Sequence, residues 1–581
     1  MSWLADHPLW RGGHWSFELR GDEIADLAFG GRPVLRSIRA VARDEDWHTP
    51  TMVVDAVDDA TPGRLALQLR SDGFGADLRG TLVVVAAADA FEVELELRAH
   101  DEFWTNRTGL VVLHPPHLAG SPLAVTHPDG TVQHTAFPQQ ISPHQPAYEI
   151  AGLRWQDAGT EVALRLGGDV FEMEDQRNWT DASFKTYNRP LALPFPYRLA
   201  TGEVIAQTLQ VRARARAAAA APAGPDARIT LAAGGTFPAL GVGAATAPDP
   251  APAFDVGTGP VLVELDLRTP NWPAALRRAA DAARQLDVRF VLGGSGAAAG
   301  APGGALGDGV RALTGLPVVR VAAFQPDGPA QHVSDHDATD ALRAALDAAG
   351  LDIPVVGGAR SHFTELNREH DRLPRDLAGI VFSMTPLFHS TATEQLVEAV
   401  AIQRLVAQQA VSLAGGVAVH VGPVTLRAHF NDVATTPPPS SGATDLAEGY
   451  GTALIDADDE RYDAPELAAW TIASAAALAV PGVATVTYFE QWGPRGPVRA
   501  DGSARPVAAA LAALGALRGA ALLHGDSPDG LVWAVGGVSR EGATTVLAAN
   551  LDRIERTLTV VTPTGEASVV LAPGGWRQVG D

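Results

Sequence analysis

The chain contains no cysteine, which excludes disulfide bonds, thiolate zinc sites, iron–sulfur clusters and a cysteine nucleophile. Basic residues are scarce as well: 44 Lys and Arg stand against 67 Asp and Glu, a formal net charge of −23. Such an acidic surface argues against nucleic-acid binding, which needs a basic face. No run of about 18 uncharged apolar residues is present, so no membrane span is predicted. Since the first residues also lack the basic and apolar regions of a secretory signal, we expect a cytoplasmic protein.

What the chain does contain is enough apolar sequence for several cores. Of its 581 residues 46% are hydrophobic and 19% are charged, a composition typical of folded rather than disordered protein. At about 150 residues per domain, this length predicts three or four domains. The 59 Gly and 42 Pro follow no period, which indicates many loops rather than a fibre.

The first part of the chain has the pattern of β-strands. Residues Leu65–Arg70, Phe91–Arg98 and Glu161–Leu166 alternate between apolar and polar side chains, and turn residues lie between such segments. Because no useful helical pattern appears here, residues 1–212 are predicted to form an antiparallel β-sandwich. Residues 213–257 are rich in Ala and Pro and are predicted to be a connecting segment.

Strand and helix patterns alternate over residues 258–504. Seven predicted strands with their helices favour a (β/α)₈ TIM barrel in which one strand escapes notice. A doubly wound open sheet has the same alternation, but its usual Gly-rich phosphate fingerprint is absent. Residues 505–581 begin with a helix and continue as short strands, which predicts a small C-terminal β-sandwich.

Polar residues that follow the predicted barrel strands are candidates for the active site, because barrel enzymes react at the carboxyl ends of their strands. Two of them, Glu365 and Glu490, form a carboxylate pair suited to acid/base chemistry and are the predicted catalytic residues. The alternative is that each Glu caps a loop or pairs with an arginine. The predicted binding residues at these strand ends are Arg360, His389, Arg427, His429, Asn431 and Trp492.

The densest polar stretch lies in the first domain, over residues 174–187, and also carries aromatic side chains. An ordinary solvated loop is one interpretation. Because its aromatic residues favour burial and its charges need partners, we instead expect the loop to insert toward the barrel mouth and complete the active-site wall. The residues predicted to bind substrate from this loop are Asp175, Arg177, Asn178 and Lys185.

Metal and serine chemistry have little support in the sequence. Five histidines cluster at positions 114, 117, 127, 134 and 144, but no pair has the helical i, i+4 spacing of a metallohydrolase. They are interpreted as structural, and neither a metal nor a cofactor is predicted. The Gly-x-Ser-x-Gly motif of common esterases is absent.

Several motifs together resemble the D-apionate lactonase family. They are the stretch from Glu174 to Tyr187, Asn106-Arg-Thr-Gly-Leu-Val-Val-Leu-His-Pro, His127-Pro-Asp-Gly, Phe363-Thr-Glu-Leu-Asn-Arg and Gly422-Pro-Val-Thr-Leu-Arg. The resemblance implies an N-terminal β domain, a TIM barrel and a small C-terminal domain. It also implies hydrolysis of D-apionolactone to D-apionate in the catabolism of apiose.

The architecture also looks like that of retaining TIM-barrel glycoside hydrolases. In those enzymes the acid/base Glu directly follows an Asn, whereas here Asn367 comes two positions after Glu365. This departure argues against a direct transfer of catalytic roles from those enzymes.

Three functions follow from these observations, all with a sugar lactone or another small carbohydrate as the ligand. In a lactonase, Glu365 or Glu490 would be the general base, and Arg360, His389, Arg427 or His429 would stabilise the oxyanion. In a glycosidase, Glu365 and Glu490 would be acid/base and nucleophile, with carboxyl groups about 5–5.5 Å apart for retention or about 6.5–9.5 Å for inversion. A non-catalytic carbohydrate-binding protein would instead expose aromatic platforms such as Trp492 and Trp104.

Overall fold

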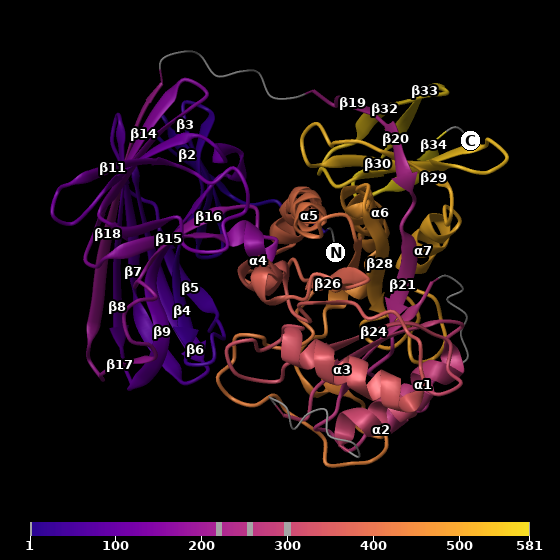
Figure 1. Cartoon of the computed structure of the whole chain (residues 1–581). Coiled ribbons are helices and arrows are strands. Elements are labelled where there is room, and N and C mark those ends of the chain that lie inside the picture. The colour runs from indigo at the N-terminus through magenta and orange to yellow at the C-terminus, as the bar shows by residue number, and fades with distance from the viewer. Residues whose placement is uncertain (1–2, 216–223, 253–258, 295–303, 580–581) are drawn as a thin grey trace.

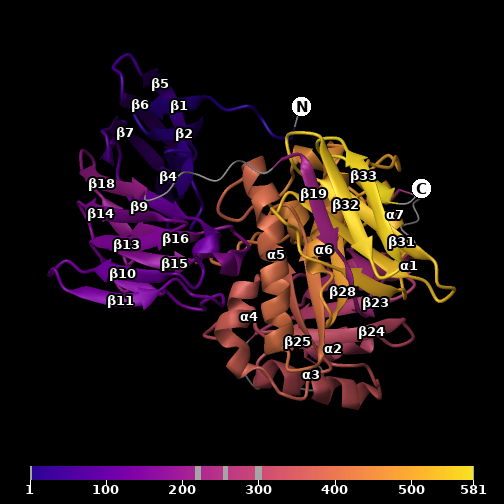
Figure 2. The same ribbon diagram turned by 90° about the horizontal axis from the view of Figure 1, so that it is seen from above.

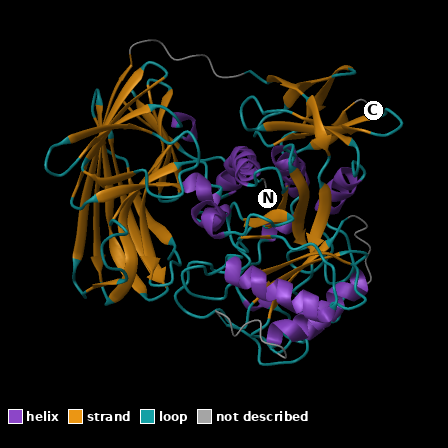
Figure 3. Ribbon diagram, in the orientation of Figure 1, coloured by secondary structure: helices purple, strands orange, loops and turns teal. Residues whose placement is uncertain are grey.

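The computed structural model describes residues 3–215, 224–252, 259–294 and 304–579. A β domain built from the N-terminal strands lies at the left of Figure 1, and the barrel and the C-terminal strands lie at the right. Helices are concentrated on the barrel (Figure 3). The predicted fold class, a β-sandwich followed by a TIM barrel and C-terminal β-strands, is confirmed.

The N-terminal domain consists of two antiparallel sheets of nine strands each. The first sheet has the order β1 (Leu9–Gly12), β2 (Trp15–Arg20), β3 (Glu23–Phe29), β4 (Arg32–Asp44), β9 (Phe103–His114), β16 (Phe184–Asn188), β15 (Phe171–Asp175) and β12 (Ala147–Ile150), with β17 (Tyr197–Leu199) beside β9. The second has the order β11 (Val132–Ala136), β10 (Pro122–Thr126), β13 (Gly152–Asp157), β14 (Thr160–Gly167), β18 (Val204–Ala215), β8 (Ala90–Ala99), β7 (Ala76–Ala86), β6 (Arg64–Gly73) and β5 (Met52–Asp58). Along β8, buried Phe91, Val93 and Leu95 alternate with exposed glutamates, so the two sheets enclose one apolar core.

Eight parallel strands form the barrel. In chain order they are β21 (Ala239–Gly243), β22 (Val261–Asp266), β23 (Leu286–Val291), β24 (Val318–Phe324), β25 (Gly357–Gly358), β26 (Gly379–Met384), β27 (Ala418–Val424) and β28 (Val483–Glu490). An isolated bridge between Val321 and Val355 joins β24 to the segment before β25 and completes the ring. The strand that the sequence pattern did not reveal is β21, which pairs with both β22 and β28.

Helices cover the outside of the barrel. They are α1 (Trp272–Ala282), α2 (Ala305–Arg311), α3 (His336–Ala349), α4 (Phe363–Glu369), α5 (Thr393–Leu413) and α6 (Glu466–Leu478), with short 3₁₀ turns η4 (His370–Arg372), η5 (Gly451–Leu454) and η6 (Glu460–Asp463). α3 ends at Gly350, whose φ of 66° lies in the left-handed region that glycine tolerates best. The N-cap residue of α5 is Ala392, and no side-chain hydrogen bond caps this helix.

Residues 213–257 were expected to be a connecting segment, but much of this range forms strands in the structure. β19 (Asp226–Thr230) joins a sheet with β32 (Arg556–Thr562) and β33 (Gly565–Leu571), and Figure 2 shows β19 beside β32. β20 (Ala232–Thr236) joins β29 (Ala521–His524), β30 (Val532–Val538), β31 (Thr544–Asn550) and β34 (Trp576–Val579). Strands that precede the barrel in sequence and strands that follow α7 (Val507–Gly515) therefore build this β unit together. Residues 216–223 and 253–258 of the segment lie outside the described residues.

In the part of the chain that the structure describes, the N-terminal domain contacts the barrel at several places, one of which is the ion pair of Arg36 on β4 with Glu398 on α5, 2.6 Å apart. The 3₁₀ turn η2 (Gln176–Trp179) packs on α4 and α5, and Asp46 accepts hydrogen bonds from Thr435 and Thr436 after β27. A further short turn, η1 (Pro116–Leu118), lies within the domain. Among the described residues, no helix is both long and apolar enough to cross a membrane.

We expect His114 to make the N-terminal domain sensitive to acid. Burial lowers the pKa of this fully buried side chain to about 3, below its usual 6.5. Below about pH 6.5, His114 therefore becomes protonated in the unfolded chain but stays neutral in the folded chain. The free energy of unfolding falls with the pH until the pH reaches the folded-state pKa. Between about pH 6.5 and pH 4.5, His114 should account for roughly 2–3 kcal/mol of the loss.

Urea unfolding of the wild type and of His114→Gln at both pH values measures this effect. Gln is the chosen replacement because it can still reach Thr186 Oγ1, which lies 2.8 Å from His114 Nε2. The variant should lose less stability on acidification than the wild type. Equal losses would contradict the prediction.

Candidate active site

A cavity of about 550 Å³ opens at the carboxyl ends of the barrel strands, where barrel enzymes bind their substrates. Its wall comes from segments that are distant in sequence but follow neighbouring strands. The polar and aromatic residues of the wall include Glu264, Asp266, Arg268, His332, Arg360, Thr425, Arg427, His429, Phe430, Asn431, Tyr450, Glu490 and Arg495. Five predicted site residues are among them: Arg360, Arg427, His429, Asn431 and Glu490.

The two glutamates of the cavity are bound to arginines. Arg360 donates from Nε to Glu264 Oε2 at 3.0 Å and from Nη2 to Oε1. Burial disfavours the Glu264 anion, but Arg360 outweighs burial and holds the pKa of Glu264 at about 2. Glu490 accepts a 2.8 Å bond from Arg495 Nε and a 2.7 Å bond from the hydroxyl of Thr246. Glu264 is thus held as an anion, and the Glu490 carboxylate is held in place by Arg495 and Thr246, an arrangement suited to binding hydroxyl groups.

His429 is the cavity residue that is ready to accept a proton. Burial lowers the pKa of its imidazole to about 4, although Glu264 opposes this effect, so the ring is neutral around pH 7. Its Nε2 is buried and has no hydrogen-bond partner among the described residues. A neutral imidazole with a vacant nitrogen is the usual form of a histidine general base.

Arg427 lies two residues before His429 and keeps donors available. Its Nε donates to Asp459 Oδ2 at 3.2 Å, and its side chain is 32% exposed. Asp459 is shared with Arg461, which binds both carboxylate oxygens. The Nη groups of Arg427 therefore offer a positive charge and N–H donors to a ligand in the cavity.

Three side chains form the wall next to His429. The guanidinium of Arg360 lies 3.8 Å from the ring centroid of Phe430, and its Nη1 donates to His332 Nδ1 at 3.2 Å. Phe430 in turn contacts the ring of His429, with centroids 4.7 Å apart. Burial, with Arg360 beside it, lowers the pKa of His332 to about 3, so this ring is also neutral.

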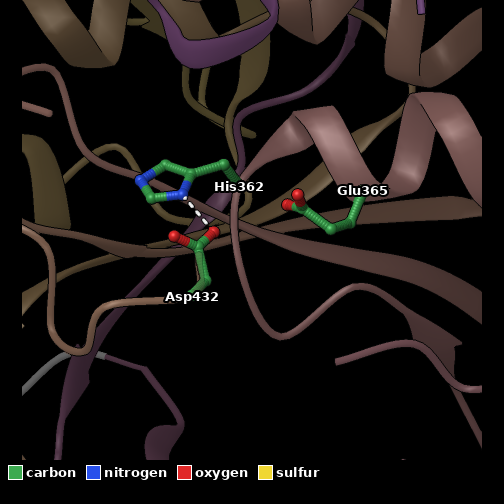
Figure 4. A group of neighbouring side chains, drawn as sticks. All are labelled: His362, Glu365 and Asp432. Atoms are coloured by element: carbon green, nitrogen blue, oxygen red, sulfur yellow. Dashed lines mark hydrogen bonds and ion pairs between the residues drawn. The ribbon is translucent and has the colours of Figure 1, made fainter. Parts of the chain in front are cut away.

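Glu365 lies in a second cluster, with His362 and Asp432 (Figure 4). His362 precedes α4, Glu365 is in the first turn of α4, and Asp432 follows the cavity residue Asn431. His362 Nδ1 lies 2.9 Å from Asp432 Oδ2, and Ser361 donates to Glu365 at 2.7 Å. Burial and the neighbouring Asp432 carboxylate raise the pKa of Glu365 to about 7. One histidine and two carboxylates at this spacing could hold a metal ion.

The structure does not bring the two predicted catalytic glutamates together in the cavity. Glu490 is part of the cavity wall, whereas Glu365 is not. Since Glu490 is also locked to Arg495, the pair does not have the form of a glycosidase acid/base and nucleophile.

The 174–187 loop lies against the barrel, on α4 and the segment after β26. Asn367 of α4 donates to Asn178 Oδ1 at 2.8 Å, and Trp179 stacks on Phe388 with ring centroids 4.5 Å apart. Asp181 lies 2.8 Å from His389 Nδ1. The loop thus contacts the segments that follow β25 and β26.

The charged residues of this loop do not reach the cavity, which corrects their predicted role in substrate binding. Arg177 is buried and binds both carboxylate oxygens of Asp175, at 2.8 and 2.7 Å. Lys185 pairs with Glu174 at 2.5 Å. Asp175, Arg177, Glu174, Lys185 and Asn178 are all absent from the cavity wall. Their charged and amide groups instead bind other groups of the protein.

Two further predicted residues also lie outside the cavity wall. His389 is engaged by Asp181, and Trp492 is only 2% exposed, packed with Ala245, Ala247 and Val498. Trp492 is therefore no platform for a sugar, whereas Trp104 is 48% exposed on β9.

Sequence reasoning missed Glu264, His332 and Asp432. Glu264 had a detectable signal, since it is a charged residue within the otherwise apolar strand Val261-Leu-Val-Glu-Leu. His332 and Asp432 lie several residues beyond their strands, in loops whose paths no short-range pattern specifies.

Comparison with protein families gives two matches that together span most of the chain. Residues 4–216 match the N-terminal domain of D-apionate lactonase, and residues 216–519 match its TIM barrel domain. The D-apionate lactonase of Brucella anthropi is 26% identical over 536 residues, which cover 84% of this chain and 83% of that protein.

Among solved structures, parts of the chain are similar to a glycoside hydrolase family 30 subfamily 8 xylanase from Clostridium acetobutylicum. The identity is 9%, the TM-score is 0.40, and 61% of this chain and 99% of the xylanase are covered. A galactose mutarotase-like protein from Lactobacillus casei is 10% identical with a TM-score of 0.26. The match covers 36% of this chain and 100% of that protein.

Proposed function

The chain belongs to the D-apionate lactonase family, and from this premise we propose that it hydrolyses D-apionolactone to D-apionate in apiose metabolism, with the barrel-mouth cavity as its active site. One observation carries the assignment to the cavity: its wall contains both a neutral His429 and an Arg427 whose Nη donors are available. A five-membered sugar lactone needs an activated water, a stabiliser for the developing oxyanion and partners for its hydroxyl groups.

His429 accepts the proton of the attacking water in this proposal. The water oxygen bonds to the carbonyl carbon while its proton moves to the imidazole, and the Glu264 anion stabilises the imidazolium that forms. The carbonyl oxygen becomes an oxyanion beside the Arg427 guanidinium. When the ring C–O bond breaks, the imidazolium returns the proton to the leaving ring oxygen, which leaves a hydroxy acid.

The arginine-bound carboxylates of the cavity would bind substrate hydroxyl groups. Glu264 and Glu490 retain lone pairs beside the bonds to Arg360 and Arg495, and each is held in one orientation. Because the low pKa of Glu264 keeps it ionised, this carboxylate accepts hydrogen bonds throughout the reaction. The arrangement thus offers separate groups for recognition and for proton transfer.

Acid release measures the proposed activity directly. Purified protein is mixed with D-apionolactone in a weakly buffered pH indicator, with heat-denatured protein as the blank for spontaneous hydrolysis. Aryl glycosides are assayed in parallel by chromophore release. Catalysed acid release without glycoside cleavage is expected; glycoside cleavage without lactone hydrolysis would overturn the proposal in favour of a glycosidase.

The pH profile should report the ionisation of His429. The charged and titratable groups acting on it are Glu264, Arg360, His362 and Asp432. A base must be neutral to act, and with a pKa of about 4 His429 stays neutral as the pH falls below the usual histidine value of 6.5. We expect kcat/KM to be level from about pH 7 down to about pH 5 and to fall as the pH approaches 4. A fall centred between about pH 6 and 7 would point to another proton acceptor.

A further inference from the structure

The residues His362, Glu365 and Asp432 are not part of the cavity wall and have no part in the proposed lactonase reaction. One nitrogen or oxygen from each side chain lies within 4.8 Å of the others. The side chains of His362 and Asp432 are 4% and 0% exposed. Figure 4 shows the Glu365 carboxylate and the His362 ring on either side of Asp432.

The negative charge of this cluster is poorly balanced by the protein. Within the described parts of the chain, neither Glu365 nor Asp432 forms an ion pair with a lysine or arginine. The cavity carboxylates differ, because Glu264 pairs with Arg360 and Glu490 with Arg495. The ion pair that the described residues give this cluster is between Asp432 and His362, with Nδ1 and Oδ2 2.9 Å apart. Glu365 remains buried beside a second carboxylate, where repulsion and the loss of hydration are costly.

An unsatisfied atom gives a second, independent indication of a missing partner. Asp432 Oδ1 is buried and has no hydrogen-bond partner among the described residues. A buried carboxylate oxygen without a donor loses its hydration and gains nothing in return. A cation beside the Asp432 carboxylate would remove this cost.

We propose that His362, Glu365 and Asp432 bind one divalent cation. An imidazole nitrogen with two carboxylate oxygens is a donor set that suits Zn²⁺ or Mn²⁺, whereas Ca²⁺ and Mg²⁺ prefer oxygen ligands alone. Metal–ligand distances of about 2.0–2.2 Å require rotations of these side chains, and a cation on His362 Nδ1 would take the place of its contact with Asp432 Oδ2. The sequence predicted no metal, because these ligands come from two separate segments rather than from one helical motif.

The cation would join two elements that shape the active site. Asp432 directly follows Asn431 of the cavity wall, and α4, which carries Glu365, packs on η2 of the N-terminal domain. Binding should therefore stabilise the folded protein, because the folded chain presents all three ligands together and the unfolded chain does not.

Calorimetric titration tests the site without reference to activity. The full chain is treated with a chelator, dialysed, and titrated with ZnCl₂ and, separately, with MnCl₂. We expect one site per chain for at least one of the two ions and a higher melting temperature in its presence. Glu365→Gln, to which Ser361 can still donate a hydrogen bond, and Asp432→Asn should each weaken binding by at least about tenfold.

Glu369→Gln is the matched control. Glu369 also lies on α4, but it pairs with Arg372 and is not part of the cluster, so its loss should leave the affinity unchanged. Absence of saturable binding of both ions up to about 1 mM would overturn the proposal, as would equal affinity in all variants. If Asp432→Asn does not fold, Glu365→Gln decides. Metal binding without lactone hydrolysis would refute only the proposed reaction, and hydrolysis without metal binding only the site.

Discussion

Replacement of His429 by glutamine should lower kcat for D-apionolactone by about 10²- to 10⁴-fold, the usual contribution of a positioned general base. Glutamine has a similar size and still forms hydrogen bonds, but its amide does not accept a proton at neutral pH. Because Arg427, Glu264 and Glu490 remain in place, KM should change by no more than about threefold. Initial rates of acid release over a range of lactone concentrations give both constants.

His420→Gln is the matched control for this experiment. His420 is also a barrel histidine, with a pKa that burial lowers to about 3, but it lies on β27, 3.0 Å from the Thr485 hydroxyl, and is not part of the cavity wall. Its replacement should leave kcat within about threefold of the wild type at temperatures where the variant is folded. Equal losses in the two variants would indicate a general effect on folding, and full activity of His429→Gln would exclude His429 as the base.

The fold was predictable where strands have a clear pattern. The alternation along β8 reports a half-buried antiparallel strand, and the capping glycine at 350 marks the end of α3. β21 escaped notice because Ala239-Leu-Gly-Val-Gly is short, contains two glycines and has no polar face. β19 and β20 escaped for another reason: their partners lie some three hundred residues later, and no local pattern predicts such pairing.

The site was predictable only as a set of candidates. Parallel strands in a barrel direct their carboxyl ends to one face, so strand positions alone brought Arg360, Arg427 and His429 to the cavity. The role of each residue depends on its partners, which the sequence does not specify. Glu490 could be a nucleophile from its position, yet Arg495, five residues later, turns back and binds it.

The 174–187 loop illustrates the same limit. Its place against the barrel followed from the need of Trp179 and its neighbours for burial, and the stack on Phe388 meets that need. The partners of its charges could not be predicted from the sequence. Asp175 and Arg177, two residues apart, bind each other rather than a ligand. Composition reports how many charges need partners and leaves open which groups supply them.

Arg177→Ala should therefore act on stability rather than on substrate binding. The side chains of Arg177 and Asp175 are 1% and 0% exposed, and Arg177 also donates to the carbonyl oxygens of Pro138 and Gln140, at 2.8 and 3.2 Å. Its removal leaves the Asp175 carboxylate buried with backbone donors only. We expect a loss of about 3–5 kcal/mol in the free energy of unfolding, the usual result of deleting one partner of a buried ion pair.

Urea unfolding followed by tryptophan fluorescence measures this loss, and a second variant tests its cause. In Asp175→Asn/Arg177→Met both charges are absent, so no unpaired carboxylate remains and the double variant should be more stable than Arg177→Ala. Below its melting temperature, Arg177→Ala should keep KM within about threefold of the wild type, because Arg177 does not reach the cavity. A variant as stable as the wild type but with turnover at least about tenfold lower would instead assign Arg177 to the substrate.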